Sequence, residues 1–272
     1  MTGHAGGVAA RPPKPGRSLV LPVGTFLFLV LTWASISEEF GIGLVSRLST
    51  SVPIFLARGP ETLAALLRPN WGFLPQTVEP MLETFRMAVI ASVIGCGVAL
   101  PVAFLASRVT APNLAIFLAD RGILSVVRAI PDFLYALVFV FAVGIGPLPG
   151  IAALILFNIG VVAKLQSETV DGVDVGPIEA ARASGAGRLQ TIRWAVLPQV
   201  LPHYVAYSLY TFELNIRAST VLGIVGAGGI GRLLFREYKF FNWSNVSVIV
   251  VELFLFVFVI ELVSIILRRR LV

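Results

Sequence analysis

Residues 174–202 read DVGPIEAARASGAGRLQTIRWAVLPQVLP, a polar stretch between two strongly apolar segments. Its acidic and basic side chains do not suit the hydrocarbon core of a bilayer. Pro177 suits the first turn of a helix, and residues 179–184 are mostly good helix formers. The two glycines that follow are expected to end or bend that helix, and a second short helix is expected at 187–197. The pattern predicts a folded helix-turn-helix loop on the cytoplasmic side of a membrane.

The composition of the whole chain is that of a membrane protein. Of its 272 residues, 57% are hydrophobic and only 13% are charged, whereas soluble domains carry about 25% charged residues. The net charge of +6 comes from Lys and Arg residues that cluster at the ends of apolar segments, which is the positive-inside pattern. We therefore expect the lipid bilayer, and no nucleic acid, as the partner of this basic chain.

Apolar stretches predict about six membrane helices, so the expected fold class is an all-α polytopic membrane protein. The first helix is expected at 19–37, uncleaved, because no convincing signal-peptide cleavage site follows it. The other five are expected at about 81–106, 122–143, 151–165, 202–224 and 246–267. Basic residues near the two chain ends predict that both termini lie in the cytoplasm.

The segments between these helices complete the predicted organisation. Residues 1–18 are rich in Gly, Pro and Arg and are expected to be disordered. Residues 38–79 are expected to form an extracytoplasmic loop that contains short surface helices. A five-helix core is expected at 80–267, with the polar loop at 171–198 inside it and a basic cytoplasmic tail at 268–272 after it.

Patterns that would indicate an enzyme or a cofactor site are not found in the sequence. None of the three lysines lies in a phosphate-binding G-x-x-x-x-G-K-[ST] loop, so the chain itself is not expected to bind ATP that way. Its one cysteine, Cys96, and its two histidines, His4 and His203, form no metal-binding cluster. Residues 226–231 satisfy G-x-G-x-x-G, but they lie in an expected outer loop, 225–244, that follows a membrane helix instead of a β-strand. We therefore predict a non-catalytic chain without a cofactor or a metal.

The fifth expected helix, 202–224, carries more polar residues than a lipid-facing helix. One of its sides carries Tyr210, Glu213, Arg217 and Thr220, and the opposite side includes Asn215. Each charge near the centre of a membrane helix costs about 2.5–3.5 kcal/mol, so these charges are expected to be paired or functional. We predict that this helix lines a translocation path, and a purely structural Glu213–Arg217 pair is the alternative.

Two further charges belong to the third expected helix. Arg128 and Asp132 flank Pro131 at an i,i+4 spacing, which allows them to neutralise each other on one helix face. Because intramembrane charges often mark a substrate pathway, they are the other candidates to line the path.

The polar loop also has the residue spacing of a known motif. An acidic residue and two alanines precede a glycine by a fixed interval, and a Leu-Pro pair follows; these residues are Glu179, Ala180, Ala181, Gly185, Leu197 and Pro198. The spacing resembles the EAA loop of ABC-importer permeases, with Ala195 at the position of the usual Ile. The resemblance implies that the loop forms coupling helices, which dock into a groove on the ATPase subunit.

Residues 80–267 resemble one branch of those permeases, the phosphonate importers. The residues that carry this likeness are Glu83-Thr84, Arg128-Ala129-Ile130-Pro131-Asp132, Lys164, Glu168, Tyr210, Glu213, Asn215, Arg217 and Gly226-Ala227-Gly228-Gly229-Ile230-Gly231. The resemblance implies a permease homodimer in a bacterial inner membrane. It also implies two ABC ATPase subunits that hold ATP and Mg, and an external binding protein that delivers phosphonate, phosphite or phosphate.

Other transport functions remain open at this point. A permease of the same superfamily for another solute, such as methionine, fits the loop equally well. An ion-coupled transporter or a channel fits the intramembrane charges, but it needs no loop that docks an ATPase. A membrane-embedded enzyme would need a cluster of carboxylates, His or Ser at one depth, and the sequence indicates none.

Overall fold

The computed structural model describes residues 20–35 and 41–269, and all secondary structure within them is helical. The predicted all-α class is therefore confirmed. The segment 1–18 and the last residues of the expected tail, 270–272, lie outside the described residues. The chain divides into two compact units, Met1–Thr62 and Leu63–Val272.

The first unit contains helix α1, Val20–Ser35, and most of helix α2, Gly41–Leu66. The apolar part of α1, Pro22–Trp33, is shorter than the roughly 20 residues that a spanning helix needs. The structure corrects the loop expected at 38–79, because α2 occupies much of that range. Two prolines, Pro53 and Pro60, lie inside α2.

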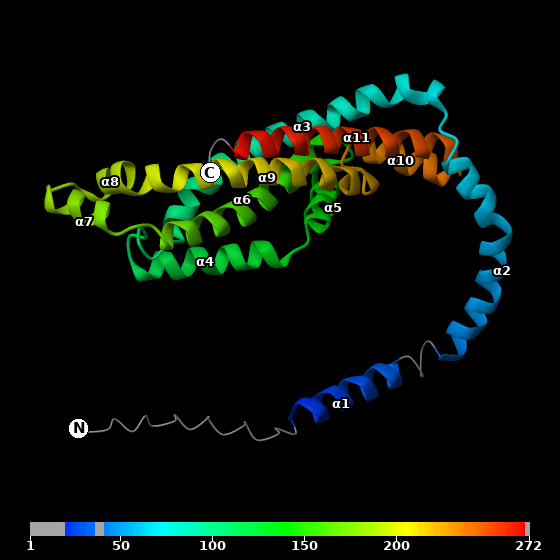
Figure 1. The fold of residues 1–272 in the computed structure, drawn as a ribbon, viewed down its shortest axis with the longest axis horizontal. Helices are drawn as coiled ribbons and strands as arrows, with labels where there is room; N and C mark the ends of the chain where they lie inside the picture. Colours follow the sequence, from blue (N-terminus) through cyan, green and yellow to red (C-terminus); the bar gives the residue numbers. More distant parts are fainter. Residues whose placement is uncertain (1–19, 36–40, 270–272) are drawn as a thin grey trace, which may run out of the picture. The chain divides into compact units, whose positions relative to one another are not determined.

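Three long helices form the centre of the second unit. They are α3, Leu74–Leu105, α6, Pro147–Asp171, and α9, Leu197–Ile224, and each packs against the other two (Figure 1). Helix α11, Trp243–Arg268, packs against α9 and α3. Small residues let the helices approach closely: an ideal Cβ on Gly95 would lie 2.6 Å from Cβ of Asn158.

The third expected span is broken in the structure. Helix α4, Leu114–Ala129, and helix α5, Asp132–Val143, meet at an angle of 85°. The residue before a proline is pushed out of the helical region, and Ile130 accordingly has φ −89° and ψ 122°. The prediction of one continuous helix at 122–143 was therefore wrong, and α4 begins before that range, at Leu114.

Short helices lie at the two ends of the bundle. Helix α7, Gly176–Ala183, and helix α8, Arg188–Thr191, lie at one end (Figure 1). Helix α10, Gly229–Lys239, lies at the opposite end and replaces most of the loop expected at 225–244.

Among the described helices, three are long and apolar enough to cross a membrane: Trp71–Leu105, α6 and α11. The number rises to five if two bent pairs each count as one span. One pair is α4 with α5, and the other is Arg188–Ile224 with α10, which are bent by 43°. The expected polytopic class thus stands, with up to five spans in this part of the chain by length and composition.

A close crossing of α9 and α10 provides a test of this packing. A Cβ at Gly231 would overlap the carbonyl oxygen of Thr220. We expect Gly231→Ala to lower the free energy of unfolding by about 1–3 kcal/mol, as overpacking does. Gly97→Ala is the matched control, because nothing lies within 4 Å of the added Cβ. Thermal unfolding of the two purified variants in detergent measures the difference, and equal melting temperatures would contradict the close crossing.

Candidate functional site

The turn after α7 is set by a glycine. Gly185 has φ +80°, a region that L side chains rarely adopt. Its N–H donates to the carbonyl of Arg182 at 2.9 Å, and the N–H of Ala186 donates to the carbonyl of Ala181 at 3.0 Å. These bonds close the end of α7 as a glycine C-cap does. Gly185 therefore fixes the direction in which the chain leaves α7.

The start of α8 is fixed by a side chain. The N–H of Gly187 donates to Oε1 of Gln190 at 2.8 Å, and the N–H of Thr191 donates to the carbonyl of Gly187 at 2.9 Å. The second helix does not end at Leu197 and Pro198, as the sequence suggested. It continues through a π-helical turn, Ile192–Val196, into α9, where Pro198 occupies the first turn. Pro198 has no N–H to donate to the preceding turn, and distortions of a helix occur where a proline removes such a bond.

One side of this loop is anchored to the bundle. Ile178 of α7 is only 2% exposed and packs in a cluster with four buried residues, Val170, Ala195, Val196 and Val200. Ala195, which replaces the usual Ile of the motif, lies inside this cluster and is 5% exposed. The anchor holds α7 and the start of α9 together as one body.

The other side of the loop is exposed. Glu179 and Ala180 of α7 are exposed, whereas Ala181 is half-buried. Leu189 and Trp194 are 81% and 71% exposed, which is unusual for large apolar side chains unless a partner covers them. The loop thus presents a carboxylate and two apolar side chains away from the bundle.

A carboxylate that sequence reasoning missed connects the loop's supporting elements. Asp171, the last residue of α6, accepts hydrogen bonds from the hydroxyl of Ser107, the N–H of Arg108 and Nη2 of Arg121, each at 2.7 Å. Arg188 of α8 donates to the carbonyl of Thr110 in the same connection between α3 and α4. The partners lie far apart in sequence, so no local pattern indicates them.

The charges of α9 form a group with two charges of α11. Arg217 pairs with Glu213 at 2.6 Å, which confirms that the i,i+4 pair exists. Glu213 also accepts from Arg268 at 3.2 Å, and Glu261 lies 3.6 Å from Arg217. Glu213 is 6% exposed, whereas the Arg217 side chain is 47% exposed. The group contains two carboxylates and two guanidinium groups, so it is formally neutral.

Three other residues of α9 that were predicted to line the path differ in how far they are buried. Asn215 is buried and donates to the hydroxyl of Ser92 in α3 at 2.8 Å, so it joins two helices. Tyr210 is 42% exposed and lies on the exposed side of α9 with Arg217. Thr220 is half-buried, and its hydroxyl donates to the carbonyl of Ile216 at 3.4 Å.

Arg128 and Asp132 do not pair in the structure. They belong to different helices because the chain breaks at Pro131, and no ion pair between them occurs in the described residues. Both line a cavity of about 240 Å³ at the break between α4 and α5. The prediction that they neutralise each other at i,i+4 was wrong, because the intervening proline ends the helix.

Comparison with known proteins identifies the family. A family described as "Binding-protein-dependent transport system inner membrane component" matches residues 99–272. The chain belongs to this family. The EAA-type resemblance predicted from residues 179–198 is therefore confirmed at the level of the family.

Two relatives of this chain are named for the transport of phosphorus oxyanions. Phosphite transport system permease protein PtxC of Stutzerimonas stutzeri is 37% identical over 219 residues, which are 79% of this chain and 80% of that protein. Phosphate-import permease protein PhnE of Mycolicibacterium smegmatis is 38% identical over 247 residues, which are 86% of this chain. Those residues are 46% of that relative, so the chain spans about half its length.

The fold of this chain is similar to that of a solved structure. An inward-facing conformation of the MetNI methionine ABC transporter matches with a TM-score of 0.66 and 23% identity. The match covers 75% of this chain and 99% of that chain. The likeness supports the all-α fold of an ABC importer permease.

Proposed function

We propose that the chain is the membrane-spanning permease subunit of an ATP-driven importer for phosphonate or a related phosphorus oxyanion, such as phosphate or phosphite. One observation carries the oxyanion assignment. The relative named for phosphite transport is 37% identical over about four-fifths of both chains. The chain itself does no covalent chemistry in this proposal, and it moves its substrate by alternating access between the two sides of the membrane.

The exposed side of the loop supports the proposed partners. Glu179, Leu189 and Trp194 would contact one of two ABC ATPase subunits, which bind ATP and Mg in place of this chain. The buried Ile178 would transmit the movement of α7 into α9, because it packs against the residues that begin α9. A second copy of the permease and an extracytoplasmic binding protein complete the proposed importer.

The charged group on α9 supports a path through the bundle. In this proposal, α9 lies beside the path, and its polar residues face the substrate as the two sides open in turn. The proposed orientation puts the loop that holds α7 and α8 in the cytoplasm, together with both chain termini. Helix α10 then lies on the extracytoplasmic side, since it is at the opposite end of the bundle (Figure 1).

Methionine is the second candidate substrate. It is favoured by the fold match to the MetNI transporter, and by a Vibrio cholerae relative named as a probable D-methionine transport system permease protein. That relative is 29% identical over 201 residues, which is less than the identity to the phosphite and phosphate relatives. The comparison therefore favours an oxyanion.

Transport by the reconstituted importer tests this proposal. The permease, its ATPase and its binding protein are placed in proteoliposomes, and uptake of labelled phosphonate, phosphite, phosphate and methionine is measured with and without ATP. We expect ATP-dependent uptake of at least one phosphorus oxyanion and no uptake of methionine above the ATP-free background. ATP-driven methionine uptake without oxyanion uptake would reject the proposed substrate class.

A further inference from the structure

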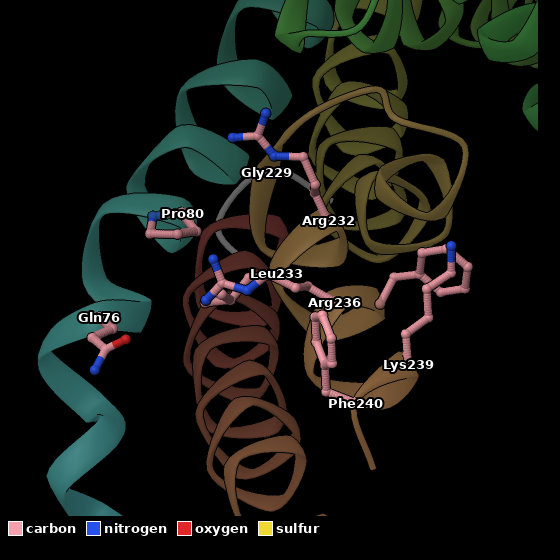
Figure 2. Close-up of a pocket in the computed structure, with 9 residues that line it drawn as sticks. Gln76, Pro80, Gly229, Arg232, Leu233, Arg236, Lys239 and Phe240 are labelled. Carbon is pink, nitrogen blue, oxygen red and sulfur yellow. The ribbon is translucent and has the colours of Figure 1, made fainter. Parts of the chain in front are cut away.

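A pocket of about 580 Å³ lies between the start of α3 and the outer side of α10 (Figure 2). Its polar lining comes from Arg232, Arg236 and Lys239 of α10 and from Gln76 of α3. The apolar lining residues are Pro80, Leu233, Phe235 and Phe240. All three basic residues are exposed, so the pocket is positively charged and open to solvent.

Two of the cations point into the space between the helices. Figure 2 shows Arg232 and Arg236 extending from α10 towards α3, where Gln76 and Pro80 lie. Lys239 turns the other way, and its ammonium lies 4.5 Å from the centre of the Phe235 ring. Arg232 and Arg236 are four residues apart on one helix, so they lie on the same helix face.

The carboxylate that contacts Arg236 is already occupied. Glu237 is 5% exposed and accepts hydrogen bonds from Asn242 at 2.9 Å, from Asn245 at 3.0 Å and from Nε of Arg236 at 3.0 Å. This contact uses Nε of Arg236 and not its terminal nitrogens. Arg232 has no ion pair among the described residues. The terminal nitrogens of both arginines are therefore available to a ligand.

The position of these cations is unusual for a membrane protein. Lys and Arg are normally concentrated on the cytoplasmic side. In the proposed orientation, α10 lies on the other side, at the end of the bundle away from α7 and α8 (Figure 1). The charges on α10 therefore need an explanation other than the control of topology.

We propose that this pocket is an external binding site for a free tetrahedral phosphorus oxyanion, held by Arg232 and Arg236. This inference rests on the proposed function, which supplies both the orientation and an anionic substrate. The planar guanidinium group presents two parallel N–H donors that match the geometry of phosphate oxygens. Gln76 adds an amide donor from α3. The site would take up the anion beside α10 before it reaches the charged group on α9.

Two other occupants share part of this chemistry. The phosphate of a lipid headgroup presents the same oxygens, and an acidic surface of the binding protein presents carboxylates. The pocket favours the small free oxyanion, because its lining comes from two helices and forms a hollow of about 580 Å³ instead of a flat surface.

The test is a titration of the permease–ATPase complex in nanodiscs of phosphatidylcholine, without binding protein or ATP, with inorganic phosphate as the probe. We expect saturable binding by the unmodified complex. Arg232→Gln and Arg236→Gln should each weaken it by about tenfold or more, as expected when charge-assisted hydrogen bonds are lost. Arg68→Gln is the matched control, since Arg68 is exposed, precedes α3 and does not line the pocket. Its affinity for phosphate should be unchanged.

Each contrary result has a separate meaning. No saturable binding, or unchanged affinity in Arg232→Gln, overturns the site. Nanodiscs that contain phosphatidylglycerol distinguish the lipid: if this lipid abolishes phosphate binding, the headgroup is the occupant and the proposal fails. If the arginine variants keep their phosphate affinity but lose docking of the binding protein, the surface is a protein contact and the proposal also fails. Failure of the proposed function appears separately, as methionine uptake without oxyanion uptake in the proteoliposome assay.

Discussion

Replacement of Gly185 by valine is expected to abolish ATP-driven uptake while the permease remains folded and inserted. Nothing lies within 4 Å of a Cβ built at this position, so the change causes no steric clash. The penalty comes from the backbone, because φ +80° is strongly disfavoured for a β-branched residue and stores about 1–3 kcal/mol of strain. The loop relieves that strain by turning differently, which displaces α7 from α8. Uptake and ATPase stimulation in proteoliposomes measure the result.

A glycine two residues further along provides the matched control. Gly187 has φ −67°, and its nearest neighbour to an added Cβ is Oε1 of Gln190 at 3.6 Å. Gly187→Ala is therefore expected to keep uptake close to the unmodified level.

A second variant tests the same loop without straining its backbone. Glu179→Arg reverses a charge on the exposed side of α7 and should uncouple ATP hydrolysis from uptake. Normal ATPase stimulation and uptake by Gly185→Val would show that the loop does not couple the permease to an ATPase.

The polar loop that holds α7 and α8 could be predicted from the sequence because its structure is decided locally. Pro177 at the start of α7 and Gly185 after its end are position-specific signals, and their spacing resembles a family motif. The apolar stretches likewise predicted α3, α6, α9 and α11, though with different ends. Helix ends moved because polar and small residues continue a helix wherever neighbouring helices cover them, as Gln166 and Ser167 do near the end of α6.

The broken and surface helices could not be predicted in the same way. Hydropathy averages over a window, so the break at Pro131 disappeared inside the apolar run from 122 to 143. Helix α10 is amphipathic and charged, and it lay within the outer loop that was expected at 225–244. Its position depends on a close contact between helices, since the backbone of Gly231 lies against Thr220.

Tertiary ion pairs were beyond sequence reasoning altogether. The Glu213–Arg217 pair was predicted because i,i+4 spacing is a local relation. The pairing of Glu213 with Arg268, 55 residues away, depends on how α11 packs against α9. The approach of Glu261 to Arg217, at 3.6 Å, depends on the same packing.

Neutralising Glu213 and neutralising Arg217 are expected to reduce the stability of the permease by very different amounts. Glu213→Gln is expected to reduce the stability of the permease by about 3–5 kcal/mol, as when one partner of a buried ion pair is removed. Glu213 is buried and holds two guanidinium groups, which both lose a carboxylate. Arg217→Gln should reduce stability far less, by about 0–1 kcal/mol, because Arg217 is half exposed and Glu213 keeps Arg268. Complex yield and thermal unfolding measure the two effects.

Uptake by the same variants separates a path residue from a structural pair. If Arg217 attracts the anion, Arg217→Gln reduces uptake although the complex assembles. The double variant Glu213→Gln with Arg217→Gln is then expected to transport no better than Arg217→Gln alone. A purely structural pair predicts nearly normal uptake by Arg217→Gln, because Glu213 keeps Arg268, and a loss of yield in the double variant, where Arg268 has lost its carboxylate. Arg268 and Glu261 remain in every variant, so the comparison isolates Arg217. Normal uptake by Arg217→Gln would remove Arg217 from the path and leave the group as a link between α9 and α11.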